Sequence, residues 1–410
     1  MFVLKFIRIL SFSFITLLSV LIVSVYGTKR HINCVRHSSE SEKGIFNLAY
    51  IRADGSEDTI HYLWSTYNLP SVIIARTTSD TKVNLDIDKL KTFEKGAITF
   101  SRSPLASIGL TISELWQLSY QTDMADIKKP SNVESLDLLN FQWSNMTNET
   151  LSCSDTSAFI NLQAYGDNPV FSNNGLFELQ FSVLGNKQAA QDFPHLIYTG
   201  NSTQIKVALN NLYLKNSTRI RYGLEIHMFS PLMQSCPMLD CKAVTTTLVS
   251  DEFSPGIFSD VDILSPCSQE DSEKGSFLTW RPVAYTSKEP SVANSSDAKL
   301  TSDCSFTDIS RVESIAGLFY NDQKNTAVNI FNVTFGTKGD GFYPKTEYVT
   351  WSLMLGTGLS VHTKLSITAI VFISVGMAAL LFFSVVAGIY YAAQYFRKKP
   401  DLLLPESSVN

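Results

Sequence analysis

The feature that most constrains this chain is a long apolar stretch, Leu365 to Phe396, which contains no charged residue. Read as a helix with a rise of about 1.5 Å per residue, it exceeds the roughly 20 residues that cross a bilayer core. Aromatic side chains gather at its far end, and three cations follow directly from Arg397, as is typical of the cytosolic side of a span. We predict a transmembrane helix over residues 365–392 and a cytosolic tail over residues 397–410.

The amino terminus has the composition of a secretory signal peptide. Lys5 and Arg8 precede an apolar run that ends at the small residue Gly27. Cleavage of residues 1–27 makes residues 28–364 lumenal or extracellular, which is a type I topology. An uncleaved signal anchor is the alternative, because the run is long and cations follow it.

Charge and length limit what the ectodomain can be. The formal net charge is −5, so the chain lacks the basic footprint of a nucleic-acid-binding protein. The stretch before the anchor is longer than one hydrophobic core usually organises. We therefore predict two lumenal β domains, residues 28–135 and 136–360, divided at the polar segment 122–135.

Six Asn-X-Ser/Thr sequons lie in the predicted ectodomain, and none has Pro in the middle position. A single tripeptide is weak evidence, but six on the lumenal side of a type I chain indicate a heavily glycosylated protein. The predicted N-glycosylation sites are Asn145, Asn148, Asn201, Asn216, Asn294 and Asn332. Glycans require exposed backbone, so we expect all six to lie on loops or strand ends.

All the cysteines also lie in the predicted ectodomain, at Cys34, Cys153, Cys236, Cys241, Cys267 and Cys304. An oxidising compartment makes disulfides the expected state, and the sequence does not decide between the pairings. Cys236 and Cys241 could form half of a metal site. No second close pair or nearby histidine completes a zinc pattern, so we expect bridges and no metal or cofactor.

Strand patterns dominate the ectodomain. Alternation with a period of two, or short runs rich in β-branched and aromatic residues, predict antiparallel strands with one face packed. These patterns cover residues 48–53, 59–64, 71–76, 82–88, 177–183, 220–228, 327–336 and 347–356. Residues 108–118 could form a short helix with Ile112, Leu115 and Trp116 on one side. The segments 231–246, 265–275 and 287–305 are expected to be loops. The predicted fold is mostly β, an antiparallel β-sandwich-like ectodomain with one C-terminal transmembrane helix.

Three blocks of sequence carry a resemblance to a known family. They are IRADGSEDTIHYLWS (Ile51–Ser65), SDEFSPGIF with FLTWRPVAY (Ser250–Phe258 and Phe277–Tyr285), and FNVTFG with TWSLMLGTG (Phe331–Gly336 and Thr350–Gly358). Together with the order of signal peptide, ectodomain, single helix and short tail, they make the chain resemble the glycosylated lysosomal membrane protein family.

The resemblance implies a function that residue spacing does not. Members of the family resemble accessory subunits of lysosomal transporters. A glycosylated lumenal domain associates with a polytopic partner of the major facilitator superfamily and shields it from proteases. The resemblance therefore implies a lysosomal membrane protein without chemistry of its own, which could also reach late endosomes or the cell surface.

Two departures from the family pattern concern the tail and the cysteines. Relatives end in a Tyr-based sorting signal, whereas this tail reads RKKPDLLLPESSVN, in which Asp401, Leu402 and Leu403 could form a dileucine signal. Relatives also carry cysteines near positions 205 and 328 that this chain lacks. Cys236 and Cys304 look retained, so the resemblance implies that this pair forms a bridge.

Two other functions remain open, an acid hydrolase and a cell-surface receptor. The adjacent carboxylates Asp251 and Glu252 would point to opposite faces of a strand, and no Gly-X-Ser-X-Gly motif is present. His61, beside Tyr62 and Trp64, is interpreted as a strand residue in a half-buried sheet. His195 and His227 have no partner suggested by spacing. Trp280 is expected in the core and Arg281 in an internal ion pair, with a ligand-binding loop as the alternative. We therefore predict no catalytic residues.

Overall fold

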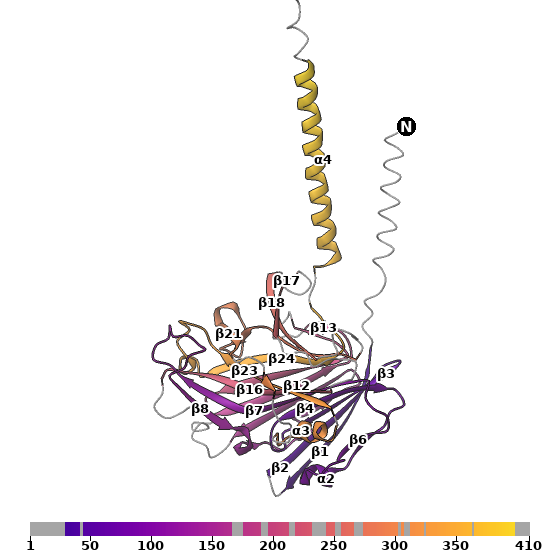
Figure 1. Cartoon of the computed structure of the whole chain (residues 1–410), viewed down its shortest axis with the longest axis vertical. Helices are drawn as coiled ribbons and strands as arrows, with labels where there is room; N and C mark the ends of the chain where they lie inside the picture. The colour runs from indigo at the N-terminus through magenta and orange to yellow at the C-terminus, as the bar shows by residue number, and fades with distance from the viewer. Residues whose placement is uncertain are drawn as a thin grey trace, which may run out of the picture. The chain divides into compact units, whose positions relative to one another are not determined.

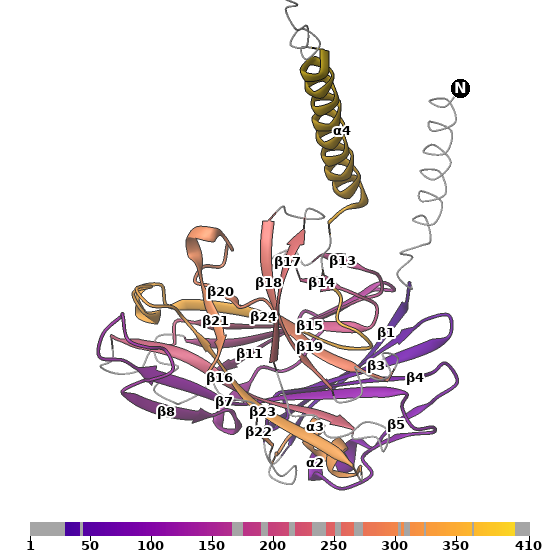
Figure 2. The same ribbon diagram turned by 45° about the horizontal axis from the view of Figure 1, so that its top comes forward.

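The computed structural model describes residues 29–41, 44–165, 175–189, 196–212, 218–231, 243–250, 256–265, 274–301, 305–306, 312–323, 325–362 and 365–397. Most of the described ectodomain is strand, and its strand pairings are antiparallel. The strands form two packed layers, with β7, β16 and β23 in one and β15, β19 and β24 in the other (Figures 1 and 2). The prediction of a mostly β, sandwich-like fold is confirmed.

The first layer has the strand order β1–β2–β3–β4–β7–β16–β23. Strand β8 pairs with the second half of β7, and the short strands β21 and β22 pair with β23. The strands are β1 (His31–Ser41), β2 (Gly44–Asp54), β3 (Asp58–Ser65), β4 (Ser71–Thr78), β7 (Ala106–Ser119), β8 (Asn132–Asp137), β16 (Ile220–Pro231), β21 (Ser295–Leu300), β22 (Ser305–Phe306) and β23 (Thr326–Phe335).

The second layer has the order β18–β19–β24–β15–β12–β11, with β9 and β10 beside β11 and β20 linking β24 to β21. Its strands are β9 (Gln142–Trp143), β10 (Leu151–Cys153), β11 (Ser157–Tyr165), β12 (Leu176–Leu184), β15 (Ser202–Asn210), β18 (Gly256–Leu264), β19 (Ser276–Trp280), β20 (Val283–Tyr285) and β24 (Tyr348–Thr357).

The remaining elements are short, apart from the last helix. They are β5 (Val83–Leu85), β6 (Ile98–Phe100), β13 (Gln188–Ala189), β14 (Ile197–Tyr198), β17 (Ala243–Ser250), α2 (Ile87–Thr92), α3 (Ile315–Asn321), α4 (Ile367–Arg397), and the 3-10 turns η1 (Leu138–Asn140), η3 (Val292–Asn294) and η5 (Tyr343–Lys345). Helix α3 packs against β4, β7 and β16. Its N-terminus is capped by the Ser314 hydroxyl, which accepts from Gly317 N at 2.9 Å.

Aromatic side chains from both layers meet in the core. Trp64 on β3 stacks on Phe181 of β12, with ring centroids 5.2 Å apart. At the other end of the sandwich, Trp280 on β19 stacks on Phe331 of β23 at 6.1 Å. Burial of such large rings is a dominant favourable term for folding, and each pair adds about 0.5–1.5 kcal/mol beyond its buried area. The core therefore holds the two layers together.

Most predicted strands lie where the patterns placed them, within β2, β3, β4, β12, β16, β23 and β24. Four local predictions are wrong. Residues 108–118 belong to the long strand β7 and form no helix. Only residues 83–85 of the predicted strand 82–88 are extended, because Asp86 accepts from Lys89 N and caps α2. The predicted loop 287–305 contains β21, and the loop expected to run to residue 246 ends where β17 begins at Ala243.

The predicted division into two domains is corrected by the strand pairing. Strand β8 runs through the expected boundary between residues 135 and 136 and pairs with β7. Strand β7 then pairs with β16, which comes from the other predicted domain. Strands from both segments also share one hydrophobic core. Residues 29–135 and 136–360 therefore contribute to one sandwich.

The described residues fall into two compact units, and each is treated by itself. The larger unit contains the described residues up to Thr246 and Ser259–His362, and the second contains Thr247–Phe258 and the chain beyond His362. Within the second unit, α4 extends five residues past the predicted end of the span at residue 392. Among the described residues it is the helix that is long and apolar enough to cross a membrane. The predicted signal peptide and the tail beyond Arg397, including Asp401, Leu402 and Leu403, lie outside the described residues.

Candidate functional sites

The predicted glycosylation sites differ in exposure. Asn145 and Asn148 are exposed, in the loop between β9 and β10. Asn201 and Asn294 are half-buried, at the start of β15 and at the end of η3. Asn332 lies within β23 opposite Glu225 and is only 9% exposed, contrary to the expectation that every sequon lies on a loop or strand end. Asn216 lies outside the described residues.

Asn201 also has a structural partner that its sequon does not reveal. Its Oδ1 accepts from Arg30 Nη2 at 2.8 Å. The Arg30 side chain is buried, and its Nη1 lies 2.7 Å from Asp58 Oδ1. This group connects the residue that precedes β1 to β3 and β15. Because a buried guanidinium needs both charge and hydrogen-bond partners, the group holds the two layers together at this end.

The most concentrated group of buried charges comprises Asp260, Asp262, Arg281 and His362, here called the His362 cluster. Asp260 and Asp262 lie on the same face of β18, because side chains two residues apart on a strand share a face. Arg281 Nη1 lies 2.8 Å from Asp260 Oδ1. His362 Nδ1 lies 2.9 Å from Asp260 Oδ2, and its Nε2 lies 3.5 Å from Asp262 Oδ2.

The electrostatics of the His362 cluster favour a protonated histidine. The hydrogen bond to Asp260 and the negative charges of both aspartates raise the pKa of His362. Burial raises the pKa of Asp262, and the Asp260 carboxylate raises it further. The cluster therefore ties His362, five positions before the first residue of α4, to β18 and to Arg281 directly after β19. The prediction that Arg281 pairs internally and that Trp280 is a core residue is confirmed.

A second polar group surrounds Arg221 on β16. Its side chain is only 1% exposed, and its Nη2 contacts Asp123 Oδ1 at 2.6 Å and Asp340 Oδ1 at 2.7 Å. The guanidinium lies beside the rings of Tyr120 and Phe342, 5.0 and 4.5 Å from their centroids, and the two rings stack on each other at 6.4 Å. Burial also leaves its Nε and Nη1 without a hydrogen-bond partner among the described residues. Arg221 lines a cavity of about 320 Å³ formed with the β20–β21 hairpin and the loop after β23.

The histidines considered as catalytic candidates have structural surroundings. On β3, His61 Nδ1 lies 2.8 Å from Tyr50 Oη and its Nε2 lies 3.0 Å from Thr77 Oγ1. Burial lowers the pKa of His61 to about 4, so it is a neutral core residue. On β16, His227 Nε2 lies 2.9 Å from Glu225 Oε1. His195, Asp251 and Glu252 lie outside the described residues, and the described residues contain no group of three or more ligands that could hold a metal ion.

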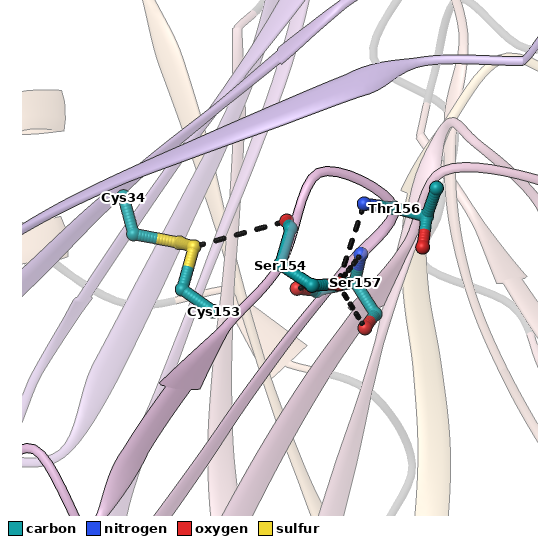
Figure 3. Close-up of a disulfide and its surroundings, with 5 residues drawn as sticks. All are labelled: Cys34, Cys153, Ser154, Thr156 and Ser157. Atoms are coloured by element: carbon teal, nitrogen blue, oxygen red, sulfur yellow. Dashed lines mark hydrogen bonds between the residues drawn. A yellow bond between two sulfur atoms is a disulfide. The ribbon is translucent and has the colours of Figure 1, made fainter.

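A disulfide joins the two layers at one edge. Cys34 on β1 is bridged to Cys153 on β10, with their Cα atoms 6.4 Å apart (Figure 3). Beside it, the Ser154 hydroxyl accepts from Ser157 N at 3.0 Å and closes the turn between β10 and β11. Cys153 was a predicted disulfide residue, but its partner was not identified from the sequence. Cys236, Cys241, Cys267 and Cys304, with the expected Cys236–Cys304 pair, lie outside the described residues.

Most of the pairings in these polar groups could not be predicted from the sequence, because the partners are far apart along the chain. Asp260 and His362 are 102 positions apart, and Arg221 and Asp340 are 119 apart. The one local signal is the Asp-X-Asp spacing of Asp260 and Asp262, which on a strand brings two carboxylates to one face and requires a nearby cation.

Comparison with known proteins identifies sequence relatives over most of the chain. The sequence model of a family described as "Glycosylated lysosomal membrane protein" matches residues 47–398. Glycosylated lysosomal membrane protein B of Xenopus laevis is 24% identical over 404 residues, covering 94% of this chain and 96% of the relative. The glycosylated lysosomal membrane protein of Homo sapiens is 26% identical over 321 residues, covering 76% and 75%.

A distant likeness to one solved structure was also found. The crystal structure of galactose 1-epimerase from Lactobacillus acidophilus NCFM matches with a TM-score of 0.32 and 8% identity, covering 80% of this chain and all of that one. At this level, the likeness supports no argument about function.

Proposed function

Because the chain belongs to the glycosylated lysosomal membrane protein family, we propose that it is a non-catalytic accessory subunit. In this proposal the chain is an N-glycosylated type I protein of the lysosomal membrane with its ectodomain in the lumen. It binds a polytopic transporter of the major facilitator superfamily, stabilises it and protects it from proteolysis.

The extent of the family match is the observation that carries this proposal. The match runs from residue 47 to residue 398 and so includes both the ectodomain and α4. A protein that needs its membrane helix as well as its folded domain is suited to a partner that lies in the same membrane. The transporter class itself rests on the resemblance of the sequence blocks to accessory subunits.

The chemistry of α4 supports a role in helix contacts. Its side chains are mostly apolar along the span, which also contains the small residues Gly376 and Gly388. Small residues let helix backbones approach closely in a bilayer, where packing and not the hydrophobic effect drives association. We expect these positions to face the partner.

The polar groups of the ectodomain support a non-catalytic role. His61 is neutral and bonded on both ring nitrogens, and the His362 cluster pairs its charges internally. A catalytic acid or base instead needs a group that can reach a substrate in a cleft. In this proposal, His61 and the His362 cluster serve as structural contacts.

Co-purification with the full-length chain tests the proposal. The chain is tagged at its tail, solubilised in a mild detergent and captured, and the recovered membrane proteins are quantified by mass spectrometry. A stoichiometric multi-span transporter is the expected result. A chain that is recovered without one would contradict the proposal and favour a receptor or a lumenal hydrolase.

Deletion of the chain tests whether it protects the transporter, and a chimera that lacks α4 tests whether α4 contributes to binding it. Deleting the chain should selectively lower the protein level of the transporter, with its mRNA unchanged, and inhibition of lysosomal proteases should restore that level. Replacing α4 by an unrelated single-span helix should weaken capture if α4 contributes to binding. Substituting Gly376→Leu tests the same contact, with Ile373→Leu as a control of equal hydrophobicity. A transporter level that does not change on deletion contradicts the protective role.

A further inference from the structure

The cavity at Arg221 lies beside a predicted glycosylation site. Its floor is formed by Arg221 and Tyr222 of β16, and its walls by the β20–β21 hairpin and the loop from Gly336 to Tyr348. Asn294, at the base of that hairpin loop and directly before β21, is part of the lining. The cavity is about 320 Å³, which is enough for a small polar ligand.

The first residue of the sequon, Asn294, lies at the edge of this cavity, and its third residue, Ser296, lies in the cavity wall. The carbonyl of Asn294 accepts from Thr286 N at 2.8 Å, which fixes its backbone at the rim. Ser296, which supplies the hydroxyl of the sequon, is buried and donates to Asp340 Oδ2 at 3.2 Å. A sugar joined to the Asn294 side chain therefore begins at the mouth of the cavity.

The lining suits a carbohydrate. Sugar rings have apolar faces that pack on aromatic side chains and hydroxyl groups that both donate and accept hydrogen bonds. Phe342 and Tyr348 supply half-exposed rings, and Lys338 and Lys345 supply exposed ammonium donors.

We propose that this cavity binds the inner sugars of the N-glycan carried by Asn294. The covalent link holds the sugar near the site at a concentration on the order of millimolar, so weak contacts are sufficient for binding. The glycan would then pack the β20–β21 hairpin against the loop after β23. It would also be hidden from enzymes that trim exposed glycans.

Protection of the glycan from digestion tests the proposal. The full-length chain is produced in mammalian cells that cannot make complex glycans, so that every site carries oligomannose. It is then digested with endoglycosidase H in its native and denatured forms, and cleavage at each site is followed by glycopeptide mass spectrometry. Native cleavage at Asn294 is expected to be several-fold slower than at the exposed Asn145, and cleavage of the denatured chain equally fast at both.

Variants of the cavity lining test whether the cavity is what protects the Asn294 glycan from cleavage. Tyr348→Ala and Lys345→Ala change its lining and should raise native cleavage at Asn294 towards that at Asn145. Phe159→Ala, which removes an exposed ring from β11, is the control and should change neither site. Thermal unfolding confirms that each variant is folded.

Three results would overturn the inference. They are an Asn294 without a glycan, a glycan cleaved as fast as that at Asn145 in the native chain, or protection that both lining variants leave intact. A cavity that serves an oligosaccharide from another molecule would give the second result. Because none of these measurements involves a transporter, failure of the inference is independent of the proposed function.

Discussion

At the scale of single residues, Asn201 combines two roles that require different variants to separate. Its side chain carries a sequon and also accepts from the buried Arg30 at 2.8 Å. Asn201→Asp and Asn201→Ala both remove the sequon, but only aspartate keeps an oxygen for Arg30. We expect the alanine variant to be less stable than the aspartate variant by about 1–3 kcal/mol, since a buried donor loses its acceptor. Denaturant unfolding of both variants measures the difference, and equal midpoints would contradict the role of Arg30.

Gly109 on β7 occupies a position where the neighbouring side chains leave space for glycine alone. A Cβ built there would lie 2.6 Å from Cε2 of Tyr320 and 3.3 Å from Cδ2 of Phe229. Gly109→Ala should therefore push α3 away from the first layer and destabilise the fold by about 1–3 kcal/mol, as overpacking usually does. Adding Tyr320→Leu should make the two changes less than additive, because the clash is removed. Strict additivity in denaturant unfolding would refute the explanation.

Residue-level predictions succeeded where the signal is local. The core position of Trp280 and the internal pairing of Arg281 depend on composition and short spacing, whereas the glycosylation sites remain predictions. The partners of Arg30, Arg221 and His362 depend on pairings between distant strands, which a single sequence does not specify. Asn332 illustrates the same limit, because its tripeptide is intact while its strand is central.

At the scale of elements, β7 was mistaken for a helix for a physical reason. Ile112, Leu115 and Trp116 have helical spacing, but the strand is nearly buried on both faces for most of its length. Such a strand loses the alternation that identifies a half-exposed one, and its apolar run then resembles a buried helix. β12 is half-exposed and keeps an alternating burial pattern, and it was predicted correctly. β16 is nearly as buried as β7, but polar residues such as Glu225 and His227 alternate with its apolar residues, and it was also predicted correctly.

The segment before α4 is the element with a predicted response to pH. Its His362 faces Asp260 and Asp262 of β18, and Arg281 lies on the far side of Asp260. Because the pKa of His362 is raised in the fold, its contribution to stability is complete below its ordinary value of 6.5 and lost as pH rises through the raised pKa. The raised pKa of Asp262 acts in the same direction at lower pH.

We therefore expect the thermal stability of the full-length chain in detergent to fall as pH rises from neutral to mildly alkaline, a range in which His61, with its lowered pKa, is neutral in the folded and unfolded chain and does not contribute. His362→Gln should flatten this dependence. His31→Gln is the matched control, because His31 contacts Asp155 while both side chains are largely exposed. A wild-type chain whose stability is independent of pH across this range would contradict the prediction, as would a His362→Gln variant with an unchanged profile.

At the scale of the whole molecule, the number of domains could not be obtained from length alone. The central contact is the pairing of β7 with β16, whose sequence positions are about a hundred residues apart. Core aromatic residues from both predicted domains then pack together, as Trp64 and Phe181 do. Strand β8 begins at Asn132 within the polar segment and runs across the boundary that was expected after residue 135. The anchor, in contrast, was predictable because membrane thickness fixes its length.

The disulfide acts at this scale because it links the first layer to the second. Cys34 and Cys153 are 119 residues apart in sequence and lie on β1 and β10. A bridge that closes so long a loop restricts the unfolded chain strongly, so the double variant Cys34→Ala with Cys153→Ala should lose about 2–5 kcal/mol. Denaturant unfolding of the full-length chain measures this loss. Because β1 also pairs with β2 along its length, the variant should remain folded.

Single variants of the same pair distinguish the bridge from side-chain packing. Cys34→Ala leaves Cys153, which is exposed in its strand, as a thiol that an alkylating reagent should label in the native chain. The wild-type chain should show no label at either position until it is reduced. If non-reducing peptide mapping instead joins Cys34 or Cys153 to one of the other cysteines, the stability of the double variant would report loss of a different bridge. The close approach of β1 and β10 would then have to be explained by the strand pairing and the core alone.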